Sequence, residues 1–526
     1  MTKTYDAIVV GGGHNGLTCA AYLARAGRSV LVLEARHVLG GAAVTEEIYP
    51  GFKFNVYSYV VSLLRPEVIR ELELAKHGLQ IHPIDSVFSP MEDGNHIVFP
   101  TDPAQERDEL KRHSARDAEM MPRFTDLMYK MAHAVKPILG YVPPNPSRQG
   151  WRDLQTTRQL GKHVGGLDKR TFSELTKLMT MSVDDFLAEY FETDLIRATT
   201  GLSGIIGTML GVKSPGTAYV LLHHYMGELD GAYTAWGAQK GGTGAVSDAI
   251  ASAALSYGAE IKLEAPVSEV MVKNGSAVGV ATEQGDEFYA KAVVSGCDPK
   301  VTFRKLVAEK ELPADFVTAV DNIKFRGSSG KVNLALDRLP TFTAMPDPAL
   351  MSGSIAISPS VDYIERAYDD AKYGGFSQRP CMEVEVPTTV DPTMAPPGKH
   401  VMSIFVQYAS YDASEAPSRD LRRDAFGDAV IDTLSEFAPD LKDVILHKQV
   451  LTPWDMEHTI GLTEGNIFQG ELTLDQLFFF RPVTGWADYR TPIRNYYQCG
   501  SGTHPGGGVT AGPGRLAARE ILGGKL

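Results

Sequence analysis

The opening 34 residues constrain this chain more than any other stretch. Residues 7–10 form a short apolar run, which predicts a buried strand, and residues 17–27 predict a helix that ends at a glycine. A second apolar run at 29–33 ends on Glu34. Between the first strand and the helix, the glycines follow the G-x-G-x-x-G spacing at Gly11, Gly13 and Gly16. This order of strand, glycine turn, helix, strand and acid predicts an α/β domain that binds a dinucleotide.

Each of these residues has a physical role in such a site. Gly11 would let the chain turn tightly out of the strand, Gly13 would let the backbone approach a pyrophosphate, and Gly16 would let helix and strand pack closely. The start of the helix offers free N–H groups to the phosphates. Glu34 would hold a ribose hydroxyl. The alternative is a glycine-rich turn in an ordinary α/β domain, which the surrounding pattern makes the weaker interpretation.

Bulk properties narrow the class of protein. The 526 residues suffice for two or more lobes with sizeable cores, and the net charge of −13 argues against a broad nucleic-acid surface. Four scattered cysteines contain no C-x-x-C pair, so neither a redox disulfide nor a metal site is expected. No signal segment precedes the first strand, which predicts a cytoplasmic protein. Peripheral contact with a membrane and oligomer formation are both compatible with this sequence.

The pattern between residues 102 and 229 is mainly helical. Within it, residues 201–222 combine small and apolar side chains but also contain Lys213 and Pro215, which makes the stretch a poor membrane span. It could line an apolar cavity or pack as ordinary helices, and the sequence favours neither. Exposed apolar helices at this place would support membrane contact.

Three separated blocks together resemble one class of FAD flavoproteins, the carotenoid desaturases and amine oxidases. The blocks are the first fifty residues, residues 241–299 and residues 489–522. Within the last block, residues 499–509 resemble the phytoene desaturase signature. The stretches 214–224 and 464–470 are similar to the phytoene-dehydrogenase-related subgroup called pyridine nucleotide-disulfide oxidoreductase domain-containing protein 2.

This resemblance implies an α/β fold with a Rossmann-type FAD-binding domain and an inserted α+β substrate domain. The FAD domain would be assembled from residues 1–100, 231–305 and 481–526. The substrate domain would consist of a helical part at 101–230 and a second part at 306–480.

The resemblance also implies which residues hold FAD. The pyrophosphate would lie at the first glycine turn and at the Gly40-Gly41 pair, and adenine would lie against the backbone of Val267. The flavin would lie near the C-terminal glycines, where a helix start stabilises negative charge on the reduced ring. The complete set is Gly11, Gly13, His14, Asn15, Gly16, Glu34, Ala35, Arg36, Gly40, Gly41, Ala42, Val267, Gly502, Gly507, Gly508 and Val509.

Two departures from the family pattern fall beside the expected flavin. Many relatives have arginine where this chain has Ala42, and carotenoid desaturases usually have Asp-x-Gly where this chain has Asn55-Val56-Tyr57. These departures argue against a carotenoid as substrate but not against FAD.

FAD would accept a hydride, and a protein base could be needed for a second proton. His504, in the glycine turn expected under the flavin, and Glu464 are the candidate catalytic residues. Packing or capping is the alternative role for His504, and a solvated turn is the alternative for Glu464 and for the neighbouring His458. Other side chains that could line the pocket are Tyr57, Tyr59, His223 and His224.

The favoured function is an FAD-dependent oxidoreductase that desaturates, saturates or isomerises a hydrophobic unsaturated lipid or isoprenoid. The first alternative is an FAD-dependent amine oxidase, which a lysine near the flavin would support. Lys240 and Lys331 are the nearest lysines that the sequence offers. The second alternative is a flavin-binding interaction protein with little turnover.

Overall fold

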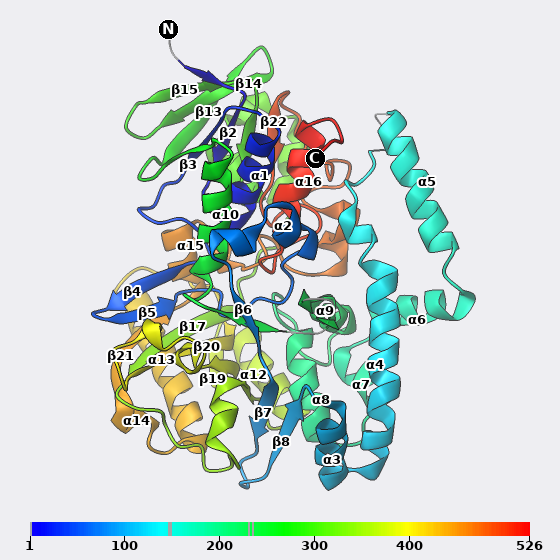
Figure 1. The fold of residues 1–526 in the computed structure, drawn as a ribbon, viewed down its shortest axis with the longest axis vertical. Helices are drawn as coiled ribbons and strands as arrows, with labels where there is room; N and C mark the ends of the chain where they lie inside the picture. Colours follow the sequence, from blue (N-terminus) through cyan, green and yellow to red (C-terminus); the bar gives the residue numbers. More distant parts are fainter. Residues whose placement is uncertain (1–2, 146–149, 230–231, 234–235) are drawn as a thin grey trace.

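The structure, a computed structural model, describes residues 3–145, 150–229, 232–233 and 236–526. Its upper part in Figure 1 is built on a five-stranded parallel sheet. In spatial order the strands are β12 (Glu260–Lys262), β3 (Val30–Leu33), β2 (Ala7–Val10), β16 (Val293–Ser295) and β22 (Tyr496–Gln498). The N-terminal, middle and C-terminal parts of the chain therefore share one sheet, and the predicted Rossmann-type α/β fold is confirmed.

Both faces of this sheet are covered, which explains why β2 and β3 are apolar at every position. Val9 and Val32 point to one face, where they share a core with three helices. Ile8 and Leu31 point to the other face, toward a four-stranded sheet. The helices are α1 (His14–Arg25), α10 (Gly244–Ser256) and α16 (Gly512–Ile521), and the strands are β1 (Thr4–Tyr5), β15 (Glu287–Ala290), β14 (Ser276–Thr282) and β13 (Val267–Lys273).

The lower left part of Figure 1 contains a seven-stranded mixed sheet. Its order is β21 (Ile445–Leu451), β17 (Ser329–Leu336), β20 (His400–Ala409), β19 (Phe376–Glu385), β18 (Ser354–Ile357), β7 (Ser86–Pro90) and β8 (His96–Pro100). The sheet takes strands from both sides of the boundary expected at residue 100, because β7 pairs with β18. Helices of the same half of the chain are α11 (Ala314–Asp321), α12 (Val361–Lys372), α13 (Ser418–Phe437), α14 (Leu441–Val444) and α15 (Pro453–Ile460).

The right side of Figure 1 is helical. It contains α3 (Pro103–His113), α4 (Ala115–Val135), α5 (Trp151–Gly165), α6 (Lys169–Thr180), α7 (Val183–Ala188), α8 (Asp194–Gly201) and α9 (Thr217–Tyr225). The apolar stretch 201–222 lies mainly inside this region, and its side chains pack in the core; Leu221 and Leu222 are fully buried. No helix among the described residues has the length and apolarity needed to cross a membrane.

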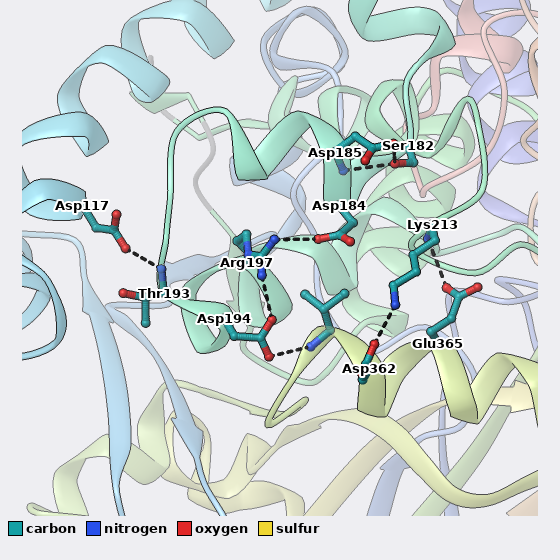
Figure 2. Close-up of polar contacts among 11 residues, drawn as sticks. Asp117, Ser182, Asp184, Asp185, Thr193, Asp194, Arg197, Lys213, Asp362 and Glu365 are labelled. Carbon is teal, nitrogen blue, oxygen red and sulfur yellow. Dashed lines mark hydrogen bonds and ion pairs between the residues drawn. The ribbon is translucent and has the colours of Figure 1, made fainter.

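A network of charged side chains joins the helical region to α12 (Figure 2). Arg197 of α8 forms ion pairs with Asp184 of α7, at 3.2 Å, and with Asp194, at 3.0 Å. A second link runs from Lys213 to Asp362 of α12, with 2.6 Å between nitrogen and oxygen. These pairs are partly exposed, and the network connects parts of the chain that are far apart in sequence.

Short elements connect the two main sheets. They are β4 (Thr45–Tyr49), β5 (Phe52–Asn55), α2 (Pro66–Glu71), β6 (Ile81–Pro83), β9 (Glu228–Leu229), β10 (Ala232–Tyr233) and β11 (Gly237–Gln239). β4 and β5 form a hairpin, and Thr45 of this hairpin accepts a hydrogen bond from the Gly244 N–H at the start of α10. The connecting elements thereby hold the middle segment of the chain against the N-terminal one.

Candidate cofactor and active site

A cavity of about 500 Å³ lies between the five-stranded sheet and the seven-stranded sheet. Its lining comes from the turn after β2, the end of β3, the segments around residues 40, 60 and 460, and the C-terminal glycine turn. A cavity at the carboxyl ends of parallel strands is the usual place for a dinucleotide in such a sheet. The volume is within the range of small-molecule sites.

The three glycines of the first turn differ in their physical constraints. Gly11 has a φ of +96°, which favours a residue without a side chain. A Cβ at Gly16 would lie only 2.2 Å from the carbonyl oxygen of Gly11, so α1 and β2 pack too closely for any other residue. A Cβ at Gly13 would meet no atom closer than 4.0 Å within the protein. The absence of a side chain at Gly13 thus serves the cavity and not the protein's own packing.

A second glycine segment lies against the first. The Gly40 N–H donates to the carbonyl of Gly12 at 2.9 Å, and Gly13 and Gly40 form an isolated parallel bridge. Gly40 and Gly41 both have positive φ, +115° and +57°. The two backbones therefore approach each other beside the cavity with no side chain between them and its space.

Glu34 lies at the end of β3 and is 8% exposed. Its carboxylate accepts hydrogen bonds from the N–H of Gly12 at 2.6 Å and from the N–H of Arg36 at 2.9 Å. These two bonds fix the carboxylate beside the glycine turn, at the cavity wall. Oxygen lone pairs that the two N–H groups leave free can accept hydrogen bonds from ribose hydroxyls.

Two buried polar atoms at the start of α1 have no hydrogen-bond partner among the described residues, namely His14 Nε2 and Asn15 Oδ1. Both residues line the cavity. Burial lowers the pKa of His14 to about 4, so its ring is neutral at physiological pH. Buried polar atoms without a partner are rare in proteins, and here a bound polar group in the cavity would supply one.

The structure brings most of the expected FAD residues together around this one cavity. Gly502 and Gly507 do not line it, because Gly502 packs against Pro299 and Gly507 against Phe468. The residues that do line it are Gly11, Gly13, His14, Asn15, Gly16, Glu34, Ala35, Arg36, Gly40, Gly41, Ala42, Val267, Gly508 and Val509.

The two candidate catalytic residues lie outside the cavity lining. His504 is fully buried, and its carbonyl accepts a hydrogen bond from the Tyr489 hydroxyl at 2.6 Å. Burial lowers the pKa of His504 to about 3. Glu464 accepts a hydrogen bond from the Arg326 N–H at 3.0 Å and lies 3.5 Å from the Lys300 ammonium. The hydrogen bond to His504 is made by its backbone, and both nitrogens of its buried ring have no hydrogen-bond partner among the described residues. A catalytic role for His504 and Glu464 stays a prediction.

Among the side chains expected as possible pocket residues, Tyr57, Tyr59, His224 and also His458 line the cavity, whereas His223 does not. His458 is exposed and stacks on Trp454, with ring centres 3.7 Å apart. Burial lowers the pKa of His224 to about 4. Lys331 lines the cavity, whereas Lys240 lies outside its lining.

Sequence reasoning missed part of the apolar wall. The missed residues come from segments that carry no motif, and their only signal was a hydrophobic side chain, which core residues share. They are Leu63, Trp236 and Phe405, whereas Ile467 and Phe468 lie in the subgroup-like stretch 464–470. Of the stretch 201–222, Ile206 reaches the cavity, so the stretch contributes both to packing and to the wall.

Comparison with known proteins identifies the family. Residues 16–522 match the family described as flavin containing amine oxidoreductase. This chain belongs to that family. It is 40% identical to pyridine nucleotide-disulfide oxidoreductase domain-containing protein 2 of Rattus norvegicus, over 99% of this chain and 94% of the relative. The expected resemblance to this subgroup is confirmed.

Other relatives of this family member are more distant. It is 28% identical to a limonene dehydrogenase polypeptide of Castellaniella defragrans, over 99% of this chain and 94% of that protein. It is 25% identical to a lycopene-forming phytoene desaturase of Pseudescherichia vulneris, over 99% and 98%. The solved structure of an oxidoreductase from Methanosarcina mazei shares the fold, with a TM-score of 0.61 and 17% identity over 98% of this chain and 99% of that one.

Membership of the family makes this protein a flavin-dependent oxidoreductase with FAD as its cofactor, as expected. The residues of the cavity fit that group: open space at Gly13, a buried acid at Glu34, and unpartnered polar atoms on His14 and Asn15. When bound, FAD supplies the acceptor for a hydride. In that site, backbone N–H groups at the start of α1 would bind its phosphates, Glu34 would hold its ribose, and the apolar wall would exclude water.

Proposed function

We propose that this flavoenzyme acts on a hydrophobic, unsaturated lipid or isoprenoid. The observation that supports this most directly is the apolar surface that Ile206, Phe405 and Phe468 give the cavity beyond the cofactor residues. A hydrocarbon gains about 25 cal/mol for each Å² of surface that it buries in such a pocket. The relative from Castellaniella defragrans is named for the dehydrogenation of a terpene, limonene, which agrees with this proposal.

The reaction would be a desaturation, a saturation or an isomerisation. The wall would hold a carbon atom of the substrate against the cofactor and keep water out of the cavity. Departures at Ala42 and Asn55 from the pattern of carotenoid desaturases favour a smaller or differently shaped isoprenoid or lipid over a carotenoid.

Anaerobic stopped-flow bleaching of the bound flavin tests the proposal. The holoenzyme is mixed with a panel of terpenes, carotenoids, fatty acids and amines, and flavin absorbance is followed. We expect at least one apolar compound to bleach the flavin. Bleaching by amines alone would overturn the assignment of substrate class, and an unreduced flavin across the whole panel would exclude the desaturation of these compounds.

Ile206→Asn provides a variant at the wall, with Ile206→Val as its matched control. Asparagine places an amide that has no partner against an apolar substrate, which costs about 1–3 kcal/mol, or roughly tenfold to a hundredfold in the rate of bleaching. Ile206→Val keeps the apolar surface and should change the rate by less than about tenfold. Equal rates in the two variants would show that this wall does not contact the substrate.

A second candidate, FAD-dependent amine oxidase, is favoured by the position of Lys331 in the cavity wall. The aromatic pair of Tyr59 and Phe405, stacked with ring centres 5.1 Å apart, also lines the cavity. However, the Lys331 ammonium lies 4.6 Å from the centre of the Tyr59 ring and would compete with a cationic amine for that face. The amine arm of the same panel decides between the candidates. A flavin that none of the compounds reduces would instead favour the interaction protein with little turnover.

A further inference from the structure

A row of ionisable side chains lies behind one wall of the cavity. In the seven-stranded sheet, Lys331 of β17 and Glu383 of β19 both pair with Phe405 of the intervening strand β20. Directly paired residues point to the same face of a sheet, so these three side chains form one row. Two residues further along the strands, Glu385 lies in the corresponding row. Register alone thus brings one lysine and two glutamates to a single face.

Tyr59 covers this row from the cavity side. Its ring stacks on Phe405 and lies under the Lys331 ammonium. Its hydroxyl donates a hydrogen bond to the Glu383 carboxylate. Tyr59 and Lys331 line the cavity, whereas Glu383 lies behind them. Tyr59 is therefore the contact between Glu383 and whatever occupies the cavity.

The ionisable side chains of the row are buried, and burial shifts their pKa values. Burial lowers the pKa of Lys331 to about 7 and raises the pKa of Glu385 to about 8. Burial also raises the pKa of Glu383, while the Tyr59 hydroxyl and the Lys331 charge act in the opposite direction. Lys331 donates to the Ser403 hydroxyl at 2.6 Å. Replacing buried charges by apolar residues is often neutral or stabilising, so stability alone does not explain such a cluster.

We propose that Tyr59 and Glu383 form a proton relay at the cavity wall, in which Tyr59 accepts a proton from the substrate and passes its own proton to Glu383. The proposal rests on the proposed function in one respect only, namely that FAD oxidises a substrate in this cavity. It assigns Tyr59 as a catalytic residue and Glu383 as a positioning residue that acts through Tyr59.

The step balances as follows. A desaturation breaks two C–H bonds on neighbouring carbons: a hydride leaves with its electron pair to the flavin, and a proton leaves from the other carbon, whose electron pair forms the double bond. The proton forms a new O–H bond on Tyr59 while the original O–H bond of Tyr59 breaks. That second proton forms an O–H bond on Glu383. Tyr59 is neutral before and after, and the Glu383 carboxylate becomes a carboxylic acid.

In the alternative, the role of Glu383 is purely structural, and its carboxylate only accepts the hydrogen bond of the Tyr59 hydroxyl. Redox-induced infrared difference spectroscopy of the holoenzyme, with dithionite as the reductant, separates the two. Reduction places negative charge in the cavity, and a carboxylate that a proton path connects to the cavity takes up a proton in response. We expect the carbonyl stretch of a buried carboxylic acid to appear on reduction and to shift in deuterium oxide.

Glu383→Gln should remove this band, and the matched variant Glu385→Gln, two residues away on the same face, should retain it. Tyr59→Phe should also lose the band, because the variant lacks the hydroxyl that passes the proton to Glu383. Flavin absorbance checks in every variant that the cofactor is bound. If Glu383→Gln fails to fold, the loss of the band in Tyr59→Phe still tests the link.

The relay is wrong if the wild-type spectrum lacks the acid band, if Glu383→Gln retains it, or if Tyr59→Phe retains it. A carboxylate with a purely structural role would give no acid band on reduction, and a band that survives in Tyr59→Phe would reach Glu383 by a path other than Tyr59. Because dithionite replaces the substrate, a failed lipid panel does not affect this experiment, and the two proposals can fail separately.

Discussion

The two ends of the cavity are built in opposite ways. At the cofactor end, the backbones of two glycine segments, around Gly13 and Gly40, face the cavity without side chains, and the site depends on this open space. At the other end, Tyr59, Lys331 and Glu383 come from parts of the chain separated by up to 324 residues, and the site depends on side chains that burial makes unfavourable. The first end therefore fits a cofactor common to many proteins, and the second can set what this protein does with it.

The largest expected effect on function is a loss of FAD affinity when the cofactor end of the cavity is changed. In Gly13→Val the new Cβ would come no closer than 4.0 Å to a protein atom, and the side chain would fill the space where a pyrophosphate would lie. We expect the protein to remain folded and to lose FAD affinity by about a hundredfold, or roughly 2.7 kcal/mol. Flavin absorbance after gel filtration, with circular dichroism of the same sample, measures both. Full flavin absorbance would show that this loop does not hold the pyrophosphate.

Gly16→Ala is the matched control for that variant. Its Cβ would lie 2.2 Å from a backbone oxygen of the protein itself, so the damage should appear as lost folding stability, about 1–3 kcal/mol. A normal denaturation midpoint for Gly16→Ala would contradict the close approach of α1 and β2.

The next prediction concerns Glu385, near the ionisable end of the cavity, and the pH dependence of folding stability. Folding raises the pKa of Glu385 from its ordinary 4.5 to about 8 through burial, partly opposed by the Ser354 hydrogen bond and the Lys331 charge. Between these values the folded chain holds a proton that the unfolded chain has released, so folding stability falls as pH rises. The wild type should lose about 3 kcal/mol more than Glu385→Gln between about pH 5 and about pH 8.

Urea denaturation at several pH values measures this difference. Glu119→Gln, which changes an exposed glutamate of α4, should show the same pH dependence as the wild type. If Glu385→Gln also follows the wild-type curve, the carboxyl group of Glu385 is not held in its neutral form.

The smallest effect concerns charges outside the cavity. Arg197 and its two aspartates in Figure 2 are partly exposed, so solvent screens their attraction. Arg197→Ala should lower the free energy of unfolding by about 0.5–1 kcal/mol and leave FAD binding unchanged. The more exposed pair of Lys213 and Asp362 offers a comparison, and Lys213→Ala should cost less. Loss of flavin in either variant would show that this network supports the cofactor site.

Sequence reasoning reached the cofactor end in detail because its residues are close in the chain. The order of strand, glycine turn, helix, strand and acid places Gly11, Gly16 and Glu34 close together at one end of the sheet. Only the local geometry of this one unit is needed to bring them together. The FAD residues expected around Gly508 and Val509 came from resemblance and also line the cavity. Gly502 and Gly507 are close in sequence to these but face packed neighbours instead.

The sequence by itself determined the Rossmann-type fold and a dinucleotide site, since glycine spacing and strand periodicity are local properties that do not depend on how the rest of the chain is arranged. That the dinucleotide is FAD followed from the family resemblance. Only the tertiary structure decided that Lys331, Glu383 and Tyr59 meet, and that His504 and Glu464 lie outside the cavity. The physical reason is strand register. A shift of one residue in the pairing of β17, β20 and β19 would turn the ionisable row to the opposite face, and no short-range pattern in the chain encodes that choice.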